Sequence, residues 1–202
     1  MLKLYHSPQS RSTRPLWLLE EIGAPYELVK LDLSKQEHKT PQYMKIHPHG
    51  VVPALHDGDL VLFESAAICA YLADKFPAAH LAPAVGTPER GRYYQWLFYA
   101  MATLEPPVLQ VFLHSVRLPE GERSAQTAEQ GRKTFAEVAA VLSNALASKP
   151  FLLGEQFSAA DVMIGSTLAW AQFMNLLEGH ATLREYVERL SSRPAFQRAW
   201  SK

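Results

Sequence analysis

Short apolar runs alternate with one amphipathic segment in the first 31 residues. Residues 2–5 and 26–31 have the length and apolar character of β-strands. Between them, residues 13–22 carry apolar side chains at helical spacing, and Gly23 follows as a stop signal. Pro15 falls in the first helical turn, where backbone N–H groups have no partner within the helix. The pattern predicts a strand, a helix and a second strand.

A hairpin signal follows at Asp57-Gly58, which stands between the apolar runs 54–56 and 60–63. Asp-Gly between such runs favours a type I′ turn, which needs positive φ at both central residues. Pro53 stands at the start of the first run. Proline has no backbone N–H to donate to a strand ladder, so it belongs at the first residue of a strand or on an edge. We expect a cis bond before it, because X-Pro bonds tolerate this form. The backbone groups of Val52 would then be open to a peptide-like partner.

Two further helices complete the first part of the chain. Residues 35–46 are mostly polar and predict a short irregular helix. Residues 65–76 carry Ile68, Leu72 and Phe76 at four-residue spacing and predict an amphipathic helix. The order β-α-β-α-β-β-α is that of a thioredoxin-like domain.

The composition changes after Pro77. Prolines and a glycine mark a linker over residues 80–88, which separates a domain over 1–79 from a second domain over 89–202. The second domain has no strand pattern and is predicted to be all-helical. Pro106-Pro107 should kink its first helix. Helices are expected over residues 89–118, 123–147, 158–177, 181–190 and 194–200.

Composition excludes several classes of protein. The 202 residues are 48% hydrophobic, enough for a sizeable core without disulfides, and 20 basic residues balance 20 acidic ones. Without a basic stripe we expect no nucleic-acid partner. The single cysteine, Cys69, allows neither an internal disulfide nor a CxxC site and fits a reducing compartment. We expect a cytoplasmic protein, since we find no signal peptide and no apolar stretch of about 18 residues that would span a membrane.

Four segments stand out by their order and spacing: Ser7-Pro8-x-Ser10-Arg11-Ser12-x-Arg14 with the helix after it, Val52-Pro53-Ala54-Leu55, Glu64-Ser65-Ala66-Ala67-Ile68, and Phe157-Ser158-Ala159-Ala160-Asp161. Together they resemble the cytosolic glutathione transferase family, specifically its serine-type bacterial members. The resemblance covers nearly the whole chain. It implies a glutathione-binding thioredoxin-like domain, a helical domain that contributes an electrophile pocket, and a homodimer. Two positions depart from the family pattern: His47 stands where Asn is common, and Val51 where a polar residue is frequent.

The serine loop is the predicted place for the glutathione sulfur. A free thiol with a pKa of about 8.5 is only slightly ionised at neutral pH. A helix N-terminus and a hydroxyl donor both favour the thiolate, which is the nucleophile. Ser12 is placed to be the helix N-cap, which would occupy its hydroxyl. Ser10 is therefore the predicted thiolate residue, which the resemblance also implies, and Ser12 is the alternative. Tyr5, in the first strand, is assigned to the core.

The rest of the glutathione site follows from the resemblance. The cysteine unit of the tripeptide would pair with the backbone of Val52 beside Pro53, as an added strand does. Glu64 and Ser65 open a helix, where N–H groups and a hydroxyl bind a carboxylate and Glu64 accepts from an ammonium group. Ser65 is also a good N-cap. The glycine carboxylate would be held by His38 or by Lys39.

Several other residues receive structural assignments or weaker functional ones. His47 and His49 lack further ligands in register, so no metal is expected. Cys69 lies in an apolar helix stripe and is interpreted as buried. Ser158-x-x-Asp161 has the spacing of a capping box. The electrophile pocket would be apolar and lie between the domains. Its candidate residues are Tyr99, Thr103, Pro107, Phe112, Trp170 and Phe173.

The predicted reaction is attack of the glutathione thiolate on a small apolar electrophile, with glutathione as co-substrate. Three alternatives stay open: a glutathione-binding protein that acts through a protein partner, a glutathione-dependent peroxidase or disulfide reductase, and an isomerase. The sequence does not identify the electrophile.

Overall fold

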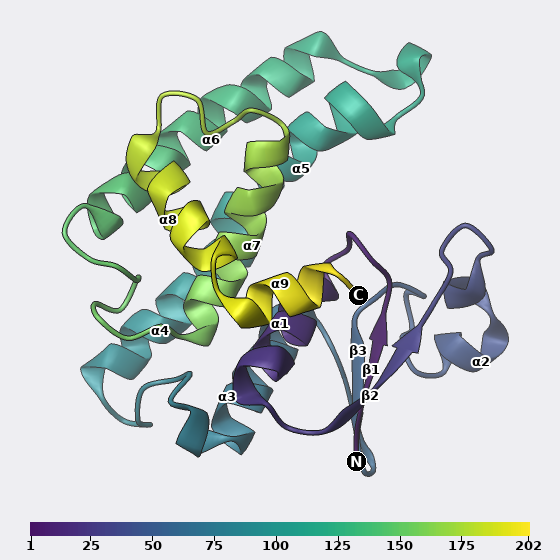
Figure 1. Ribbon diagram of the computed structural model, residues 1–202. Helices are drawn as coiled ribbons and strands as arrows, with labels where there is room; N and C mark the ends of the chain where they lie inside the picture. Colours follow the sequence, from purple (N-terminus) through teal and green to yellow (C-terminus); the bar gives the residue numbers. More distant parts are fainter. The chain divides into compact units, whose positions relative to one another are not determined.

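The computed structural model describes all 202 residues, Met1–Lys202, as two compact units (Figure 1). Unit 1 comprises Met1–Ala82 and Ser191–Lys202, and unit 2 comprises Pro83–Leu190. The sequence-based division placed everything from residue 89 onward in one helical domain. The structure instead groups the last twelve residues, Ser191–Lys202, with the N-terminal unit.

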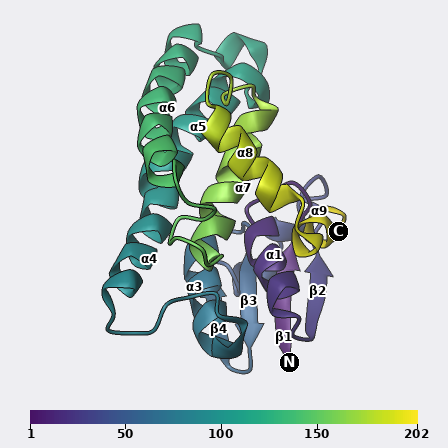
Figure 2. The same ribbon diagram turned by 60° about the vertical axis from the view of Figure 1, so that its left-hand side comes forward.

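A four-stranded sheet forms the centre of unit 1, with strand order β2-β1-β3-β4 (Figure 2). β1 runs parallel to β2, and β3 is antiparallel to both β1 and β4. The register places Leu4 opposite Leu28 on one side and Leu55 on the other. The strands are β1 (Leu2–His6), β2 (Tyr26–Lys30), β3 (Ala54–Asp57) and β4 (Leu60–Phe63).

The β3–β4 hairpin is present, but its turn differs from the predicted one. Asp57 pairs with Leu60 as the last strand residue, so the central turn residues are Gly58 and Asp59. Gly58 has φ +61, and Asp59 is not among the residues with positive φ. Glycine at the first central position is the pattern of a type II′ turn. The predicted type I′ turn was therefore wrong, because strand pairing extends one residue further than the apolar run.

Helix α1 (Thr13–Ile22) is the main buried helix of unit 1 and has the predicted bounds. Leu16, Trp17, Leu18 and Leu19 are all fully buried. Gly23 ends the helix in the left-handed region at φ +72. The other elements of unit 1 are α2 (Pro41–Met44), α3 (Ser65–Lys75), α9 (Pro194–Trp200) and the short turns η1 (Glu37–Lys39) and η2 (Pro77–Ala79).

The C-terminal helix α9 packs on α1, far from it in sequence (Figure 1). The ring of Trp17 meets that of Phe196 edge to face at a centroid distance of 4.9 Å. Arg193 forms two hydrogen bonds with the carboxylate of Glu21, at 2.6 and 2.8 Å. Glu20 is bound by Arg198, Lys202 and Tyr26. Aromatic packing and paired charges together hold the end of the chain against α1.

Unit 2 is entirely helical. Its first helical stretch is interrupted by a π-helical segment, η3, directly before Pro106 and Pro107, which confirms that these prolines disturb the helix. The elements are α4 (Pro88–Tyr99), η3 (Ala100–Leu104), α5 (Glu105–Phe112), the π-helical η4 (Leu113–Arg117), η5 (Glu120–Glu122), α6 (Ala125–Leu146), α7 (Ala159–Phe173) and α8 (Ala181–Ser191), whose last residue belongs to unit 1.

Helix α7 is the core helix of unit 2, and it begins with the predicted capping box. The Asp161 carboxylate is fully buried and accepts from Leu152 N–H and Ser158 N–H, each at 2.9 Å. It also accepts from the Ser158 hydroxyl at 3.0 Å and from the Tyr186 hydroxyl at 2.7 Å. Asp161 thus joins the start of α7 to α8 and to the segment after α6.

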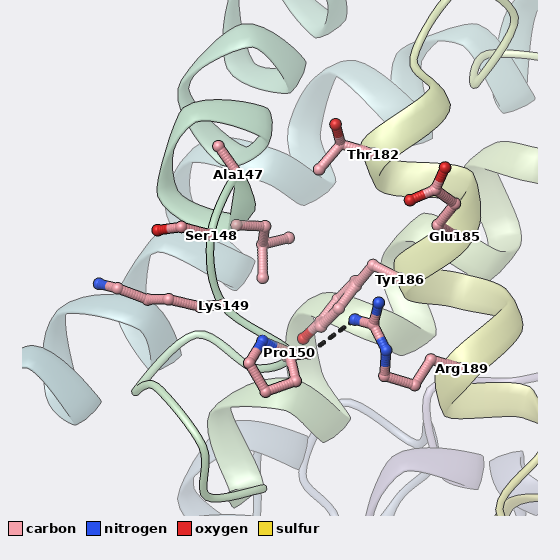
Figure 3. A pocket seen from close by; sticks show the side chains of 9 residues that line it. Ala147, Ser148, Lys149, Pro150, Thr182, Glu185, Tyr186 and Arg189 are labelled. Atoms are coloured by element: carbon pink, nitrogen blue, oxygen red, sulfur yellow. Dashed lines mark hydrogen bonds between the residues drawn. The ribbon is translucent and has the colours of Figure 1, made fainter.

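A cavity of about 260 Å³ lies between the end of α6 and α8 (Figure 3). Tyr186 and Arg189 line it from α8. Arg189 donates from Nη1 to the carbonyl of Pro150 at 2.9 Å, and Tyr186 is the residue bonded to Asp161. Both polar groups are thus committed to protein partners.

The stretch Pro88–Arg117 is long and apolar enough, by length and composition, to cross a membrane. The sequence-based statement that no such stretch exists was wrong in that respect. A core helix of a globular domain passes the same test, and here α4 packs on α7 while α5 packs on α6. This packing buries part of the stretch, whereas Phe98 is 73% exposed.

Candidate functional site

The loop from Ser7 to Ser12 follows β1 and is closed by its own hydroxyls. Ser10 Oγ donates to the carbonyl of Ser7 at 2.6 Å and lies 2.6 Å from Ser12 Oγ. The backbone N–H of Ser12 also donates to Ser10 Oγ, at 3.2 Å. Ser12 is fully buried, whereas Ser10 is half-buried. Ser10 is thus the more accessible hydroxyl, but it has protein partners.

The predicted capping role of Ser12 was wrong. Ser12 stands at the N-cap position of α1, but its hydroxyl makes no bond to a helix N–H. Instead Ser12 Oγ accepts from Ser7 N–H at 3.1 Å and contacts His6 Nδ1 at 2.8 Å. The Ser12 hydroxyl therefore bonds to Ser7 N–H and His6 instead of to a helix N–H, because the loop folds back on β1.

His6, the last residue of β1, is 1% exposed. Burial lowers the pKa of His6 to about 4; the nearby Lys30 and Lys202 add to this effect, and the Ser12 contact opposes it. The imidazole is therefore neutral at physiological pH. Sequence reasoning missed His6, although Leu2, Leu4 and His6 share one strand face by their period of two, and all three are buried.

An open cavity of about 500 Å³ lies beside the serine loop. Ser7 and Pro8 form one wall, and the segment after β2 forms the other. That segment is shaped by Asp32, whose carboxylate accepts from the N–H and hydroxyl of Ser34 at 2.9 and 2.6 Å. No motif in the sequence marks this cavity. Its remaining lining residues are Lys30, Leu31, Leu33 and Glu37.

The Val52–Pro53 peptide bond is cis. Tyr43 donates its hydroxyl to the carbonyl of Val51 at 2.7 Å, which fixes the approach to this bond. No group of the protein bonds to the N–H or the carbonyl of Val52. The backbone N–H and carbonyl of Val52 therefore have no partner within the chain, as expected, and the residue is 8% exposed.

Gly50 lets the chain pass close to the η1 turn just before this edge. It has φ +54, and an added Cβ would lie 2.6 Å from the carbonyl oxygen of His38. Only glycine fits this position. Lys39 Nζ donates to the carbonyl of His49 at 2.9 Å, while His38 Nδ1 is buried without a partner. Both candidates for the glycine carboxylate thus lie in η1, against the loop that precedes Val52.

Glu64 and Ser65 lie at the start of α3, and the N-cap falls one position earlier than the sequence suggested. The N-cap is Glu64, with φ +72, and Ser65 is the first helical residue, so the expected Ser65 cap was wrong. Positive φ in a non-glycine residue is uncommon and typical of functional sites. Arg14 from α1 donates from Nη1 to Ser65 Oγ at 3.3 Å, and both side chains are buried. Sequence reasoning missed this Arg14 contact.

The side chains of Tyr5, His47 and Cys69 pack against other residues of unit 1. Tyr5 packs against Tyr43 at a ring distance of 5.4 Å, and His47 is buried with its ring 5.0 Å from that of Phe63. Cys69 is fully buried, and burial raises the pKa of its thiol to about 12. A thiol with this pKa is not a nucleophile at neutral pH.

The residues predicted to line the electrophile pocket all lie in unit 2, and their side chains range from buried to exposed. The rings of Phe112 and Trp170 meet edge to face at 5.2 Å. Tyr99 is half-buried beside Trp96, with their rings 5.3 Å apart. Thr103 is exposed, Pro107 is buried, and Phe173 is 75% exposed. The structure thus brings Phe112 and Trp170 together.

Known proteins match the chain over almost its whole length. The family model "Glutathione S-transferase, N-terminal domain" matches residues 1–74, and that of the C-terminal domain matches residues 125–189. Glutathione S-transferase F9 of Arabidopsis thaliana is 32% identical over 100% of this chain and 97% of its own. The chain belongs to the glutathione S-transferase family. Its fold, a thioredoxin-like α/β unit plus a helical unit, is the fold of that family.

Two further family members bear on the chemistry. The disulfide-bond oxidoreductase YfcG of Escherichia coli is 30% identical over 100% of this chain and 95% of its own. The crystal structure of glutathione transferase URE2P6 from Phanerochaete chrysosporium, in complex with oxidized glutathione, is also similar. It has a TM-score of 0.89 and 29% identity, covering 99% of this chain and 94% of that one. The relatives of this chain thus include proteins named as glutathione transferases and one named as a disulfide-bond oxidoreductase.

Proposed function

We propose that unit 1 binds glutathione and that the bound thiolate attacks a small apolar electrophile. The observation that carries this proposal is the open backbone edge at Val52, beside the cis bond to Pro53. A tripeptide offers a complementary N–H and C=O at its cysteine unit, so it can add to this edge as a strand does. Membership in the glutathione S-transferase family supports the choice of tripeptide.

The two ends of the tripeptide have matching partners on either side of Val52. The free N–H groups in the first turn of α3 and the Ser65 hydroxyl suit the γ-glutamyl carboxylate, and Glu64 suits its ammonium group. The buried Arg14, bonded to Ser65 Oγ, adds positive charge at the carboxylate end. His38 or Lys39 would hold the glycine carboxylate.

Ser10 is the proposed donor to the thiolate, with Ser12 as the alternative. Ser10 is the less buried of the two and lies before the N-terminus of α1, where an anion is favoured. In the reaction the thiol proton leaves to solvent, the sulfur forms a bond to carbon with its electron pair, and the leaving group departs with the electrons of the broken bond. Ser10 lowers the thiol pKa and thereby raises the concentration of nucleophile.

The test is turnover by the purified full-length chain with three classes of second substrate. We expect saturable glutathione binding and conjugation of a nitro-activated aryl chloride, seen as release of chloride and formation of the thioether. A hydroperoxide and a mixed disulfide are assayed at the same enzyme concentration. Saturable binding without turnover of any of the three would contradict the proposal and favour a binding protein that acts through a partner.

A second candidate function is reduction of disulfides, and the similarity to YfcG favours it. The chain's own thiol is buried, so glutathione must supply both electrons. One glutathione thiolate attacks the disulfide, which releases one thiolate and leaves a mixed disulfide. A second glutathione then releases the other thiol and forms oxidised glutathione. Faster turnover of the mixed disulfide than of the aryl chloride would identify this as the main activity.

The remaining proposals concern the electrophile and the assembly. We propose that Tyr99, Thr103, Phe112 and Trp170 of unit 2 contribute to binding the electrophile, with the Phe112–Trp170 pair as its apolar part. A homodimer and a cytoplasmic location are also proposed from family membership and from the single buried cysteine. Detoxification of reactive compounds is the role that fits such a reaction.

A further inference from the structure

His6 begins a chain of hydrogen bonds that ends at Ser10. His6 Nδ1 lies 2.8 Å from Ser12 Oγ, which in turn lies 2.6 Å from Ser10 Oγ. We propose that His6 is a positioning residue, which orients the two hydroxyls so that Ser10 can only donate its proton. This inference rests on the proposed function of Ser10 and adds a residue that acts through Ser12.

The position of the imidazole proton follows from burial. A neutral imidazole carries one N–H and one acceptor nitrogen. His6 Nε2 is buried and has no hydrogen-bond partner. A buried N–H donor without a partner is rarer than an unsatisfied acceptor, so the proton belongs on Nδ1. His6 therefore donates to Ser12 Oγ.

The direction of the next bond follows from counting protons. Ser12 Oγ accepts from His6 Nδ1–H and from Ser7 N–H, which uses both of its lone pairs. Its own proton must then be donated, and the nearest acceptor is Ser10 Oγ at 2.6 Å, compared with the Ser7 carbonyl at 3.1 Å. The Ser12 hydroxyl thus points toward Ser10.

Ser10 Oγ can then act only as a hydrogen-bond donor. It accepts from the Ser12 hydroxyl and from Ser12 N–H, so its lone pairs are occupied. Its proton goes to the Ser7 carbonyl at 2.6 Å in the free protein and can turn to a sulfur anion when one is present. With the proton on Nε2 instead, Ser12 would donate to His6, and Ser10 would be free to donate to Ser12. The His6 tautomer therefore sets the direction of the chain.

The variants His6→Asn and His6→Leu test this inference. An asparagine amide can place an N–H near the position of Nδ1, whereas leucine has no donor. The readout is the ultraviolet titration of the thiolate of enzyme-bound glutathione. We expect His6→Leu to raise the pKa of the bound thiol by about one unit, the effect of one weakened charge-assisted bond. KM for glutathione should change little, and His6→Asn should titrate like the wild type.

A second measurement on the wild-type protein does not depend on any variant's folding. Long-range proton–nitrogen correlation spectra of histidine-labelled protein report which ring nitrogen carries the proton. We expect Nδ1 for His6, and a proton on Nε2 would overturn the inference. An unchanged titration in His6→Leu together with a shifted one in Ser10→Ala would also reject it while leaving the proposed function intact. An unchanged titration in Ser10→Ala would reject the proposed role of Ser10 itself.

Discussion

Arg14 in α1 and Ser65 in α3 are joined by a buried hydrogen bond, with Nη1 3.3 Å from Oγ. This bond places a guanidinium charge under the helix N-terminus proposed to hold the γ-glutamyl carboxylate. We predict that Arg14→Met raises KM for glutathione about tenfold, the equivalent of roughly 1.4 kcal/mol of lost binding. At saturating glutathione, kcat should fall less, because this charge binds ground state and transition state alike.

The matched control for this prediction is Arg92→Met. Arg92 is an exposed arginine of α4 that faces Glu89 at 3.9 Å. It should leave KM and kcat unchanged. A lower kcat with unchanged KM in Arg14→Met would show that Arg14 acts on the sulfur end and would refute its assignment to the carboxylate end.

Lys39 is predicted to be the main partner of the glycine carboxylate, ahead of His38. Its ammonium group is held 2.9 Å from the His49 carbonyl, in the loop that precedes Val52. Lys39→Met should raise KM for glutathione several-fold, by about 1 kcal/mol of binding. His38→Gln should raise it less. Binding of γ-glutamylcysteine, which lacks the glycine, should be equal in Lys39→Met and wild type; a loss of binding there would contradict the assignment.

Glu20 is predicted to make the stability of unit 1 sensitive to acid. Burial raises the pKa of Glu20, but hydrogen bonds from Lys202, Tyr26 and Arg198 outweigh burial and lower it from 4.5 to about 2. A depressed carboxyl pKa stabilises the fold above pH 4.5, and this contribution is lost as the pH falls to about 2.

The variant Glu20→Gln isolates this effect from the other carboxylates. At neutral pH it should lower the free energy of unfolding by roughly 2 kcal/mol, a figure discounted for partial exposure. Below pH 4.5 the difference between variant and wild type should shrink. Urea unfolding at a series of pH values measures both quantities. A constant difference across this range would mean that the ionisation of Glu20 contributes nothing.

Asp161 is predicted to be the most sensitive polar residue of unit 2, because four donors converge on its buried carboxylate. Asp161→Asn turns an amide N–H toward some of these donors and should lower the free energy of unfolding by about 3 kcal/mol. Tyr186→Phe removes one donor and should cost about 1 kcal/mol. Chemical unfolding of both variants gives the comparison, and equal losses would show that the Tyr186 bond accounts for the whole effect.

Most of the fold could be predicted from the spacing of apolar residues and from the glycines and prolines at the ends of helices and strands. The bounds of α1 and α9 agree with the apolar spacing, because Gly23 and Pro194 mark helix ends by local backbone preference. What local preference could not predict is where α9 lies. Its packing on Trp17 depends on contacts between residues almost 180 positions apart. For the same reason the division made from the sequence grouped the last residues with the helical domain, whereas the structure groups Ser191–Lys202 with unit 1.

The local geometry of the candidate site was predicted where backbone chemistry alone decides it, as at the cis bond before Pro53, and less well where side chains choose among partners. Proline at a strand start indicated the open edge at Val52. The capping preference of serine indicated that Ser12 would bond to α1, but the end of β1 took its hydroxyl instead. The contacts of His6 and Arg14 depend on burial, which single-residue patterns do not specify.

The central claim is that Ser10 stabilises the thiolate of bound glutathione. The most direct test is the ultraviolet titration of that thiolate in wild type, Ser10→Ala and Ser12→Ala. In the wild type the bound thiol should titrate one or two units below its free value of about 8.5. Ser10→Ala should return it close to the free value, and Ser12→Ala should raise it less. A pKa in Ser10→Ala equal to that of the wild type would contradict the account.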